Sequence, residues 1–170
     1  MLDRSTIWPY EDGEPGEFYY QRYAHPAGVE AERKLGALEG GRALLFPSGS
    51  GAATALLLAF LESGRTVALA QDAYYGTPVL MRMLEGWGLR LAEFDQTGAP
   101  PDEADLVWVE SPSNPLLTLP DLDAAVAHPA PTGVDATAST PVYLRPLAIW
   151  SIEEALRRRR TTVAGGTLSG

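Results

Sequence analysis

Blocks of apolar and polar residues follow one another along the chain in a pattern that predicts alternating helices and strands. Short apolar runs at 66–70, 89–94 and 106–109 are typical of buried strands. Stretches dominated by helix formers at 52–61 and 78–87 precede the first two of these runs. Because strands that alternate with helices pair in parallel, the pattern predicts an α/β fold with a mostly parallel sheet and helices on both faces.

An amphipathic helix is predicted before this central part, at 29–38, with Gly40 and Gly41 ending it. Its apolar positions, which we expect to face a core, are Val29, Leu35 and Leu38. The residues before it, 1–27, are rich in glycine, proline, tyrosine and acidic side chains and predict an irregular N-terminal arm. The aromatic cluster at 18–23 in this arm suggests contact with another subunit, or packing on the arm's own domain.

The C-terminal part of the chain has a weaker pattern. It favours a short helix at 121–127, the end of a strand at 133–135 and a last helix at 152–160. The four arginines 157–160 are typical of a solvated helix end, where cations lie near the negative end of the helix dipole. We see no internal repeat and no linker, so 28–170 is predicted to form one domain.

The segment 43–54 combines an apolar run, a small-residue turn and a helix. Residues 44–46 are predicted to form a strand that Pro47 ends, so that Ser48 to Gly51 lie at a helix start. The first N–H groups of a helix have no partner within it, and the helix dipole adds partial positive charge, so an open glycine turn attracts a phosphate. A tight connection that binds nothing has the same pattern, and this alternative stays open.

Composition narrows the possible ligands. The 170 residues are 45% hydrophobic and 21% charged, which is the balance of a globular protein with a core. A net charge of -9 argues against nucleic acid or an anionic membrane surface as a partner and favours a small molecule. The chain has no cysteine, which excludes disulfides, thiol catalysis and cysteine metal sites, and no metal site is predicted. Without a leader-like start or an apolar run of about 18 residues, we expect a cytoplasmic protein.

Polar residues follow the predicted strands. Asp72 and Tyr74 come after the first, the segment 110–115 after the third, and Asp135 after the last. Each has a structural explanation as a turn former, a cap or a packed aromatic. Because open α/β sheets bind ligands at the carboxyl ends of their strands, these residues together predict one pocket.

In order along the chain, several segments resemble motifs of the Cys/Met-metabolism family of pyridoxal-phosphate (PLP) enzymes, which includes cystathionine gamma-synthase, the cystathionine lyases and methionine gamma-lyase. The segment 110–115, Glu-Ser-Pro-Ser-Asn-Pro, is close to the family's Glu-Ser-Pro-x-Asn-Pro. The other matching segments are 20–26, 48–52, 74–77 and 134–147. The resemblance implies part of the large domain of a fold-type I PLP-dependent transferase and a transsulfuration-type reaction, an elimination or replacement at the beta or gamma carbon of a cysteine-, cystathionine-, methionine- or homoserine-derived amino acid.

The resemblance also implies a phosphate site. Backbone N–H groups of Gly49 and Ser50 would hold the phosphate of pyridoxal 5'-phosphate. Tyr20 and Arg22 would complete the site from a neighbouring subunit, so a homo-oligomer is expected.

Further residues are implied around the cofactor ring. Tyr74 would stack on the ring, and Asp135 would pair with the ring nitrogen and keep it protonated. Asn114 would contact the substrate beside the ring's phenolic oxygen, and Thr137 would lie at the ring edge.

One departure from the family affects activity. The family's Schiff-base lysine should follow the Arg-Pro-Leu at 145–147, but Lys34 is the only lysine in the sequence. The family's C-terminal small domain also has no counterpart in these residues. We therefore assign no catalytic residue and expect impaired or no activity in this chain.

Two other functions stay open. One is a non-catalytic remnant or interaction subunit of the same family. The other is an NAD-binding Rossmann domain, because residues 49–54, followed by Asp72 after the next strand, imitate a dinucleotide-binding motif. The NAD hypothesis leaves Tyr20, Arg22 and Asn114 unexplained.

Overall fold

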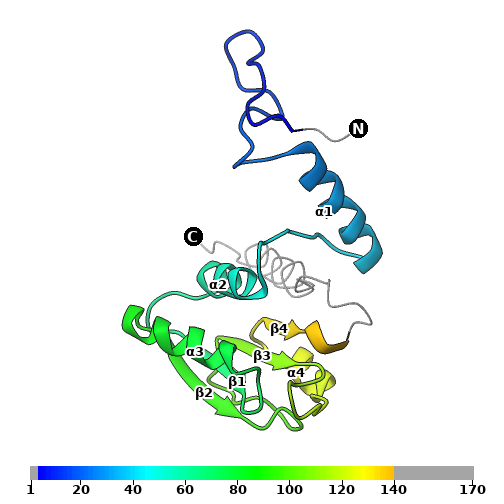
Figure 1. Ribbon diagram of the computed structural model, residues 1–170. Coiled ribbons are helices and arrows are strands. Elements are labelled where there is room, and N and C mark those ends of the chain that lie inside the picture. Colours follow the sequence, from blue (N-terminus) through cyan, green and yellow to red (C-terminus); the bar gives the residue numbers. More distant parts are fainter. Residues whose placement is uncertain (1–3, 140–170) are drawn as a thin grey trace, which may run out of the picture. The chain divides into compact units, whose positions relative to one another are not determined.

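The computed structural model describes residues 4–139 (Figure 1). The chain divides into two compact units, residues 1–45 and 46–170. The predicted helix at 152–160 and its arginines lie outside the described residues.

The second unit contains a four-stranded sheet in which every pair of neighbouring strands is parallel. Its order is β2-β1-β3-β4. The strands are β1 (Thr66–Ala70), β2 (Arg90–Phe94), β3 (Leu106–Glu110) and β4 (Thr132–Asp135). All four strands predicted between residues 66 and 135 are confirmed. Strand β2 begins one residue later than predicted, and β3 ends one residue later.

Helices follow the predicted segments closely. They are α2 (Gly49–Phe60), α3 (Gly76–Met83), the 3-10 turn η1 (Leu84–Trp87), α4 (Leu122–Ala127) and the 3-10 turn η2 (Thr137–Ser139). Helix α4 begins after Asp121, whose side chain accepts a hydrogen bond from the N–H of Ala124 at 2.9 Å. Side-chain caps thus mark the starts of α2 and α4, whereas α3 begins without one.

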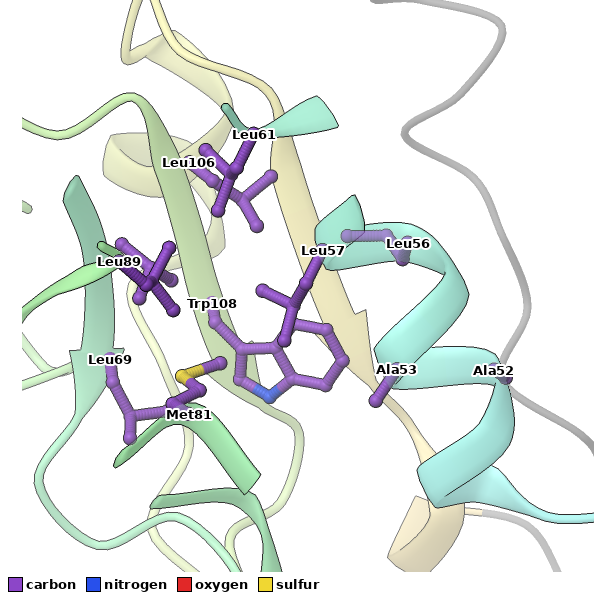
Figure 2. Packing of buried hydrophobic residues seen from close by; sticks show 11 residues of the cluster. Ala52, Ala53, Leu56, Leu57, Leu61, Leu69, Met81, Leu89, Leu106 and Trp108 are labelled. Carbon is purple, nitrogen blue, oxygen red and sulfur yellow. The ribbon is translucent and has the colours of Figure 1, made fainter. Parts of the chain in front are cut away.

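One face of the sheet is buried under α2 and α3. Figure 2 shows the Trp108 ring of β3 at the centre of this core, with Leu57 of α2 and Met81 of α3 beside it. Each of these three side chains is at most 1% exposed. Burial of a side chain such as Leu57 contributes roughly 1.5–3 kcal/mol.

The opposite face carries a second core, in which Val107 and Val109 of β3 lie with Ala125 of α4. Residues of β3 thus alternate between the two cores, since Leu106 and Trp108 belong to the first. The expectation of helices on both faces of a parallel sheet is confirmed.

The strand predicted at 44–46 is wrong. Leu44 and Leu45 lie in irregular backbone and are 46% and 40% exposed. The N–H of Leu45 donates to the Glu32 carboxylate at 2.9 Å. In a strand, this N–H would donate to a backbone carbonyl of a neighbouring strand.

The first unit contains helix α1 (Pro26–Glu39), which ends at Gly40 in the left-handed conformation, as predicted. The predicted core contacts of Val29 and Leu38 are wrong, because these side chains are 39% and 79% exposed, whereas Leu35 is half-buried. Residues 4–45 contain no second helix that could cover this face. Only Gly36 is buried in α1, where the chain folds back and Gly41 donates to the Gly36 carbonyl at 2.9 Å.

The N-terminal arm consists of aromatic contacts rather than regular structure. The rings of Trp8 and Phe18 lie 6.0 Å apart, and those of Tyr19 and Tyr23 are stacked at 5.3 Å. Two isolated antiparallel bridges pair Ile7 with Tyr20 and Glu11 with Glu14. In the part of the chain that the structure describes, no helix combines the length and apolar character needed to cross a membrane.

Candidate functional site

The predicted polar residues of the second unit leave the sheet at its carboxyl edge. Asp135 is the last residue of β4 and lies opposite Glu110, the last residue of β3. Strand β1 pairs with the other side of β3, so the turn that carries Asp72 and Tyr74 starts from the same edge. The structure therefore brings together the three segments that the sequence predicted to meet.

Helix α2 begins at the small-residue turn. Ser48 is its N-cap, and the Ser48 hydroxyl oxygen accepts a hydrogen bond from the N–H of Gly51 at 3.0 Å. The N–H groups of Gly49 and Ser50 have no acceptor within residues 4–139, and both residues are exposed. Two donors at the positive end of the helix dipole are thus open to an anion.

The direction of α2 follows from its connection to the sheet. Only residues 61–65 join its end to the start of β1, so the end of α2 lies near the beginnings of the strands. Figure 2 agrees, because Leu61 lies beside Leu106 at the start of β3, whereas Ala53 lies by the Trp108 ring. The start of α2 consequently points toward the carboxyl edge.

Asp135 is half-buried and uses one of its two carboxylate oxygens within the chain. Its Oδ1 accepts hydrogen bonds from the N–H and the hydroxyl of Thr137, at 2.9 and 2.6 Å. These bonds fix the carboxylate at the end of β4. Within residues 4–139, Oδ2 has no donor and is free to accept a hydrogen bond from a ligand.

Tyr74 lies at the start of the β1–α3 crossover and is 37% exposed. Its ring lies against the Tyr75 ring with 4.5 Å between centroids, and a side-chain hydrogen bond with Tyr75 raises the pKa of Tyr74. Gly76 leaves room for the ring, because a Cβ there would lie 2.7 Å from Tyr74 Cε1. The local sequence thus holds an aromatic ring at the edge of the sheet.

Asn114 is exposed in the loop after β3, and the rest of this loop is firmly bonded. Buried Ser113 exchanges hydrogen bonds with Thr118, donating its N–H at 2.9 Å and accepting at its hydroxyl at 3.1 Å. These bonds close the loop into a compact turn that presents Asn114 to solvent.

Glu110 is a residue of this edge whose individual role the sequence did not reveal. It is 2% exposed, and its Oε1 accepts a hydrogen bond from the N–H of Tyr74 at 2.7 Å. Burial raises the pKa of Glu110 to about 7, and the charge of nearby Asp135 adds to the shift. A carboxylate directly after four apolar residues of a buried strand was the signal available in the sequence.

Tyr20 and Arg22 belong to the first unit. The Arg22 guanidinium lies over the Tyr20 ring, 4.5 Å from its centroid. Their part in a phosphate site stays a prediction, because α2 belongs to the second unit.

Several α/β folds combine a parallel sheet, helices on both faces and polar residues at the carboxyl edge, and solved structures assign this chain to the class of the fold-type I PLP-dependent enzymes. The chain is similar to metB from Corynebacterium glutamicum, with 30% identity and a TM-score of 0.71 over 78% of this chain and 38% of that one. It is also similar to cystathionine gamma-synthase from Xanthomonas oryzae in complex with cystathionine, with 31% identity and a TM-score of 0.69 over 77% and 37%.

The sequence profile described as Cys/Met metabolism PLP-dependent enzyme matches residues 3–150, and the chain belongs to this family. It is 34% identical to a putative cystathionine gamma-lyase from Streptomyces coelicolor, over 81% of this chain and 38% of the relative. It is 35% identical to cystathionine gamma-synthase from Mycobacterium tuberculosis, over 79% and 38%. The chain thus spans well under half the length of these relatives.

Family membership leaves the NAD hypothesis without support. The dinucleotide motif also requires a strand directly before the glycine turn, and residues 44–46 form none.

The residues present fit the family's cofactor, PLP. Free N–H groups at Gly49 and Ser50 suit a phosphate, and a free Asp135 oxygen suits a protonated ring nitrogen. Asp72 Oδ2 is also buried at this edge with no partner among the described residues. An unsatisfied acceptor of this kind is expected where a further group completes a site.

Proposed function

We propose that residues 46–139 form the phosphate- and ring-binding part of a PLP site in a transsulfuration-type enzyme. The observation that carries the proposal is the pairing of two features at one edge: free N–H groups at the start of α2, and a free carboxylate oxygen on Asp135. When bound, PLP supplies an electron-withdrawing ring that weakens the bonds to the alpha carbon of an amino acid.

Each residue of the edge has a defined task in this proposal. Gly49 and Ser50 hold the phosphate through their N–H groups, and Asp135 keeps the ring nitrogen protonated through Oδ2. Tyr74 covers one face of the ring, Thr137 fixes the Asp135 carboxylate, and Asn114 faces the substrate.

The substrate class proposed for the whole protein comes from its relatives, which are named for cystathionine synthesis or cleavage. We propose a sulfur-containing or homoserine-derived amino acid. Since residues 46–170 contain no lysine, this chain would bind PLP without a covalent bond and turn over little or no substrate alone. A non-catalytic remnant or interaction subunit would bind PLP in the same way, and only an elimination assay separates the two.

The assembly is proposed to be a homo-oligomer in which Tyr20 and Arg22 reach the phosphate of a neighbouring chain. The Arg22 guanidinium is exposed and its planar donors suit a phosphate. Replacing Arg22 with alanine should weaken PLP binding, whereas replacing Arg33, which pairs with Glu30 at 2.8 Å, should not. A cytoplasmic location stays a prediction.

A titration with PLP, followed by absorbance before and after borohydride reduction, tests the proposal. We expect saturable binding that leaves no reduced adduct on the protein. The affinity should be at least tenfold weaker in Asp135→Ala, because this variant loses one hydrogen bond to a charged group. Asp123→Ala, which removes an exposed carboxylate from the first turn of α4, is the matched control and should bind normally. No binding by the wild-type chain, or equal binding by both variants, would contradict the proposal.

A further inference from the structure

Glu110 lies between two segments that carry proposed cofactor and substrate contacts. Its Oε1 accepts hydrogen bonds from the Tyr74 N–H at 2.7 Å and from the Thr77 hydroxyl at 3.4 Å. The backbone N–H of Asn114 also favours the charged form of this carboxyl. One buried side chain is therefore bonded to the turn after β1 and interacts electrostatically with the loop after β3.

Other bonds hold the far end of the loop and do not involve the carboxyl. Buried Gln96 accepts from the Glu110 N–H at 3.0 Å and donates to the Thr118 carbonyl at 3.3 Å. The Asp121 N–H donates to the Gln96 carbonyl at 2.7 Å. Because the Gln96 bonds already anchor β3 to the loop, the Glu110 side chain acts mainly on Tyr74 and Asn114.

We propose that Glu110 is a positioning residue that holds the Tyr74 turn and the Asn114 loop against the carboxyl edge beside Asp135, in the geometry that binds the cofactor. This inference rests on the proposed PLP site. It assigns Glu110 no contact with PLP or substrate, only the orientation of the residues that make such contacts.

The surroundings of Glu110 couple its charge to that of Asp135. The titratable groups on the elements around it are Asp135 on β4, and Asp72 and Tyr74 in the β1–α3 turn. No salt bridge neutralises Glu110 within residues 4–139. When Asp135 pairs with a protonated ring, the repulsion between the two carboxylates decreases and the pKa of Glu110 should fall. The charged form of Glu110 can accept hydrogen bonds at both oxygens. PLP binding should therefore strengthen the interactions of Glu110 with the N–H groups of Tyr74 and Asn114.

The test compares PLP affinity of the full chain with that of Glu110→Gln between pH 5.5 and 8.5. Glutamine has the shape of the neutral carboxyl and one acceptor oxygen. Because both proteins bind the same ligand at each pH, the ratio of the two dissociation constants cancels the titration of PLP itself. We expect the variant to bind about tenfold more weakly at pH 8.5, as for the loss of one hydrogen bond to a charged group. At pH 5.5 the two proteins should agree within about twofold, because the side chain at position 110 is then mostly uncharged in wild type and always uncharged in the variant. Thr77→Val, which removes only the long hydroxyl contact, should change affinity less than about threefold at any pH.

A ratio that is constant with pH would overturn the proposal, since it would indicate a purely structural role. Amide hydrogen exchange without PLP keeps the test separate from the proposed function. At pH 8, where the wild-type carboxyl is charged, the Tyr74 and Asn114 amides should exchange at least fivefold faster in Glu110→Gln. The amides of β1, whose exchange follows global stability, serve as the internal reference in each protein. If wild type binds no PLP, this result would still support the positioning role while the proposed function fails. Equal exchange rates in the two proteins would reject it.

Discussion

Gly76 shows how one missing side chain places an aromatic ring at the candidate site. A Cβ at this position would lie 2.7 Å from Tyr74 Cε1, so Gly76→Ala must push the ring away. Because the ring is partly exposed and free to move, the free energy of unfolding should change by less than about 1 kcal/mol. PLP binding should weaken by about 1 kcal/mol, the value of one aromatic contact. A PLP titration and urea unfolding measure the two effects.

Gly86→Ala is the control for this change. A Cβ at Gly86 meets nothing within 4 Å, so neither affinity nor stability should decrease. Unaltered PLP affinity in Gly76→Ala would show that the Tyr74 ring does not contact the cofactor.

Glu110 gives the protein a pH dependence of stability. Its pKa rises from an ordinary value of 4.5 to about 7 in the folded protein, so the folded state binds this proton more tightly than the unfolded chain. The resulting stabilisation is complete below pH 4.5, decreases as the pH rises toward 7 and is lost above it. Its full size is about 3 kcal/mol. The difference in unfolding free energy between wild type and Glu110→Gln, measured in urea from pH 4.5 to 8.5, should decrease by about this amount; a constant difference would contradict the account.

The chemistry of individual residues could be predicted only in part from the sequence. Ser48, Gly49 and Ser50 were placed correctly at a helix start, because a helix cap is encoded locally. Burial of Glu110 could not be predicted in the same way, since it depends on α3 and the Asn114 loop closing over the end of β3. The prediction that Val29 and Leu38 face a core was wrong for a related reason. The periodicity of apolar residues does not show whether another element packs against them.

Among the elements, the start of α2 carries the proposed phosphate site and can be tested by its cap. Ser48→Ala removes the hydroxyl oxygen that accepts the Gly51 N–H, and should lower the free energy of unfolding by about 1 kcal/mol. A loosened first turn also holds Gly49 and Ser50 less well, so PLP should bind more weakly. Thermal unfolding and a PLP titration measure the two effects.

Asp121→Ala provides the matched comparison, since Asp121 caps α4 through a similar bond of 2.9 Å to the Ala124 N–H. This variant should lose similar stability and keep its PLP affinity. If both variants lost PLP affinity equally, the lower affinity of Ser48→Ala would result from reduced global stability and not from a change at the start of α2.

The elements with the strongest patterns were the ones predicted best. Strand β1 matches its predicted bounds because a short apolar run buried on both faces has few other solutions. The run at 44–46 is also apolar, but it pairs with no strand among residues 4–139 and forms irregular backbone. Pairing is a property of the sheet, so a single run could not decide the outcome.

At the scale of the whole molecule, the chain joins a unit with an aromatic arm to a unit with a parallel sheet. Its net charge of -9 leaves anion binding to local features such as the start of α2, because no general positive field attracts a phosphate. The fold class could be predicted from the alternation of helices and strands. The relation of Tyr20 and Arg22 to the sheet could not, because it depends on how chains assemble.

The most direct test of the account is an NMR titration of the full chain with PLP, followed at each backbone amide. We predict that the shifts concentrate at Gly49 and Ser50, at Tyr74, and at Thr137 next to Asp135, because one molecule would contact all three places. Pyridoxal without the phosphate should leave the amides of Gly49 and Ser50 unshifted. Shifts confined to the surroundings of Lys34, or none at all, would contradict the claim that the carboxyl edge of this sheet is a PLP site.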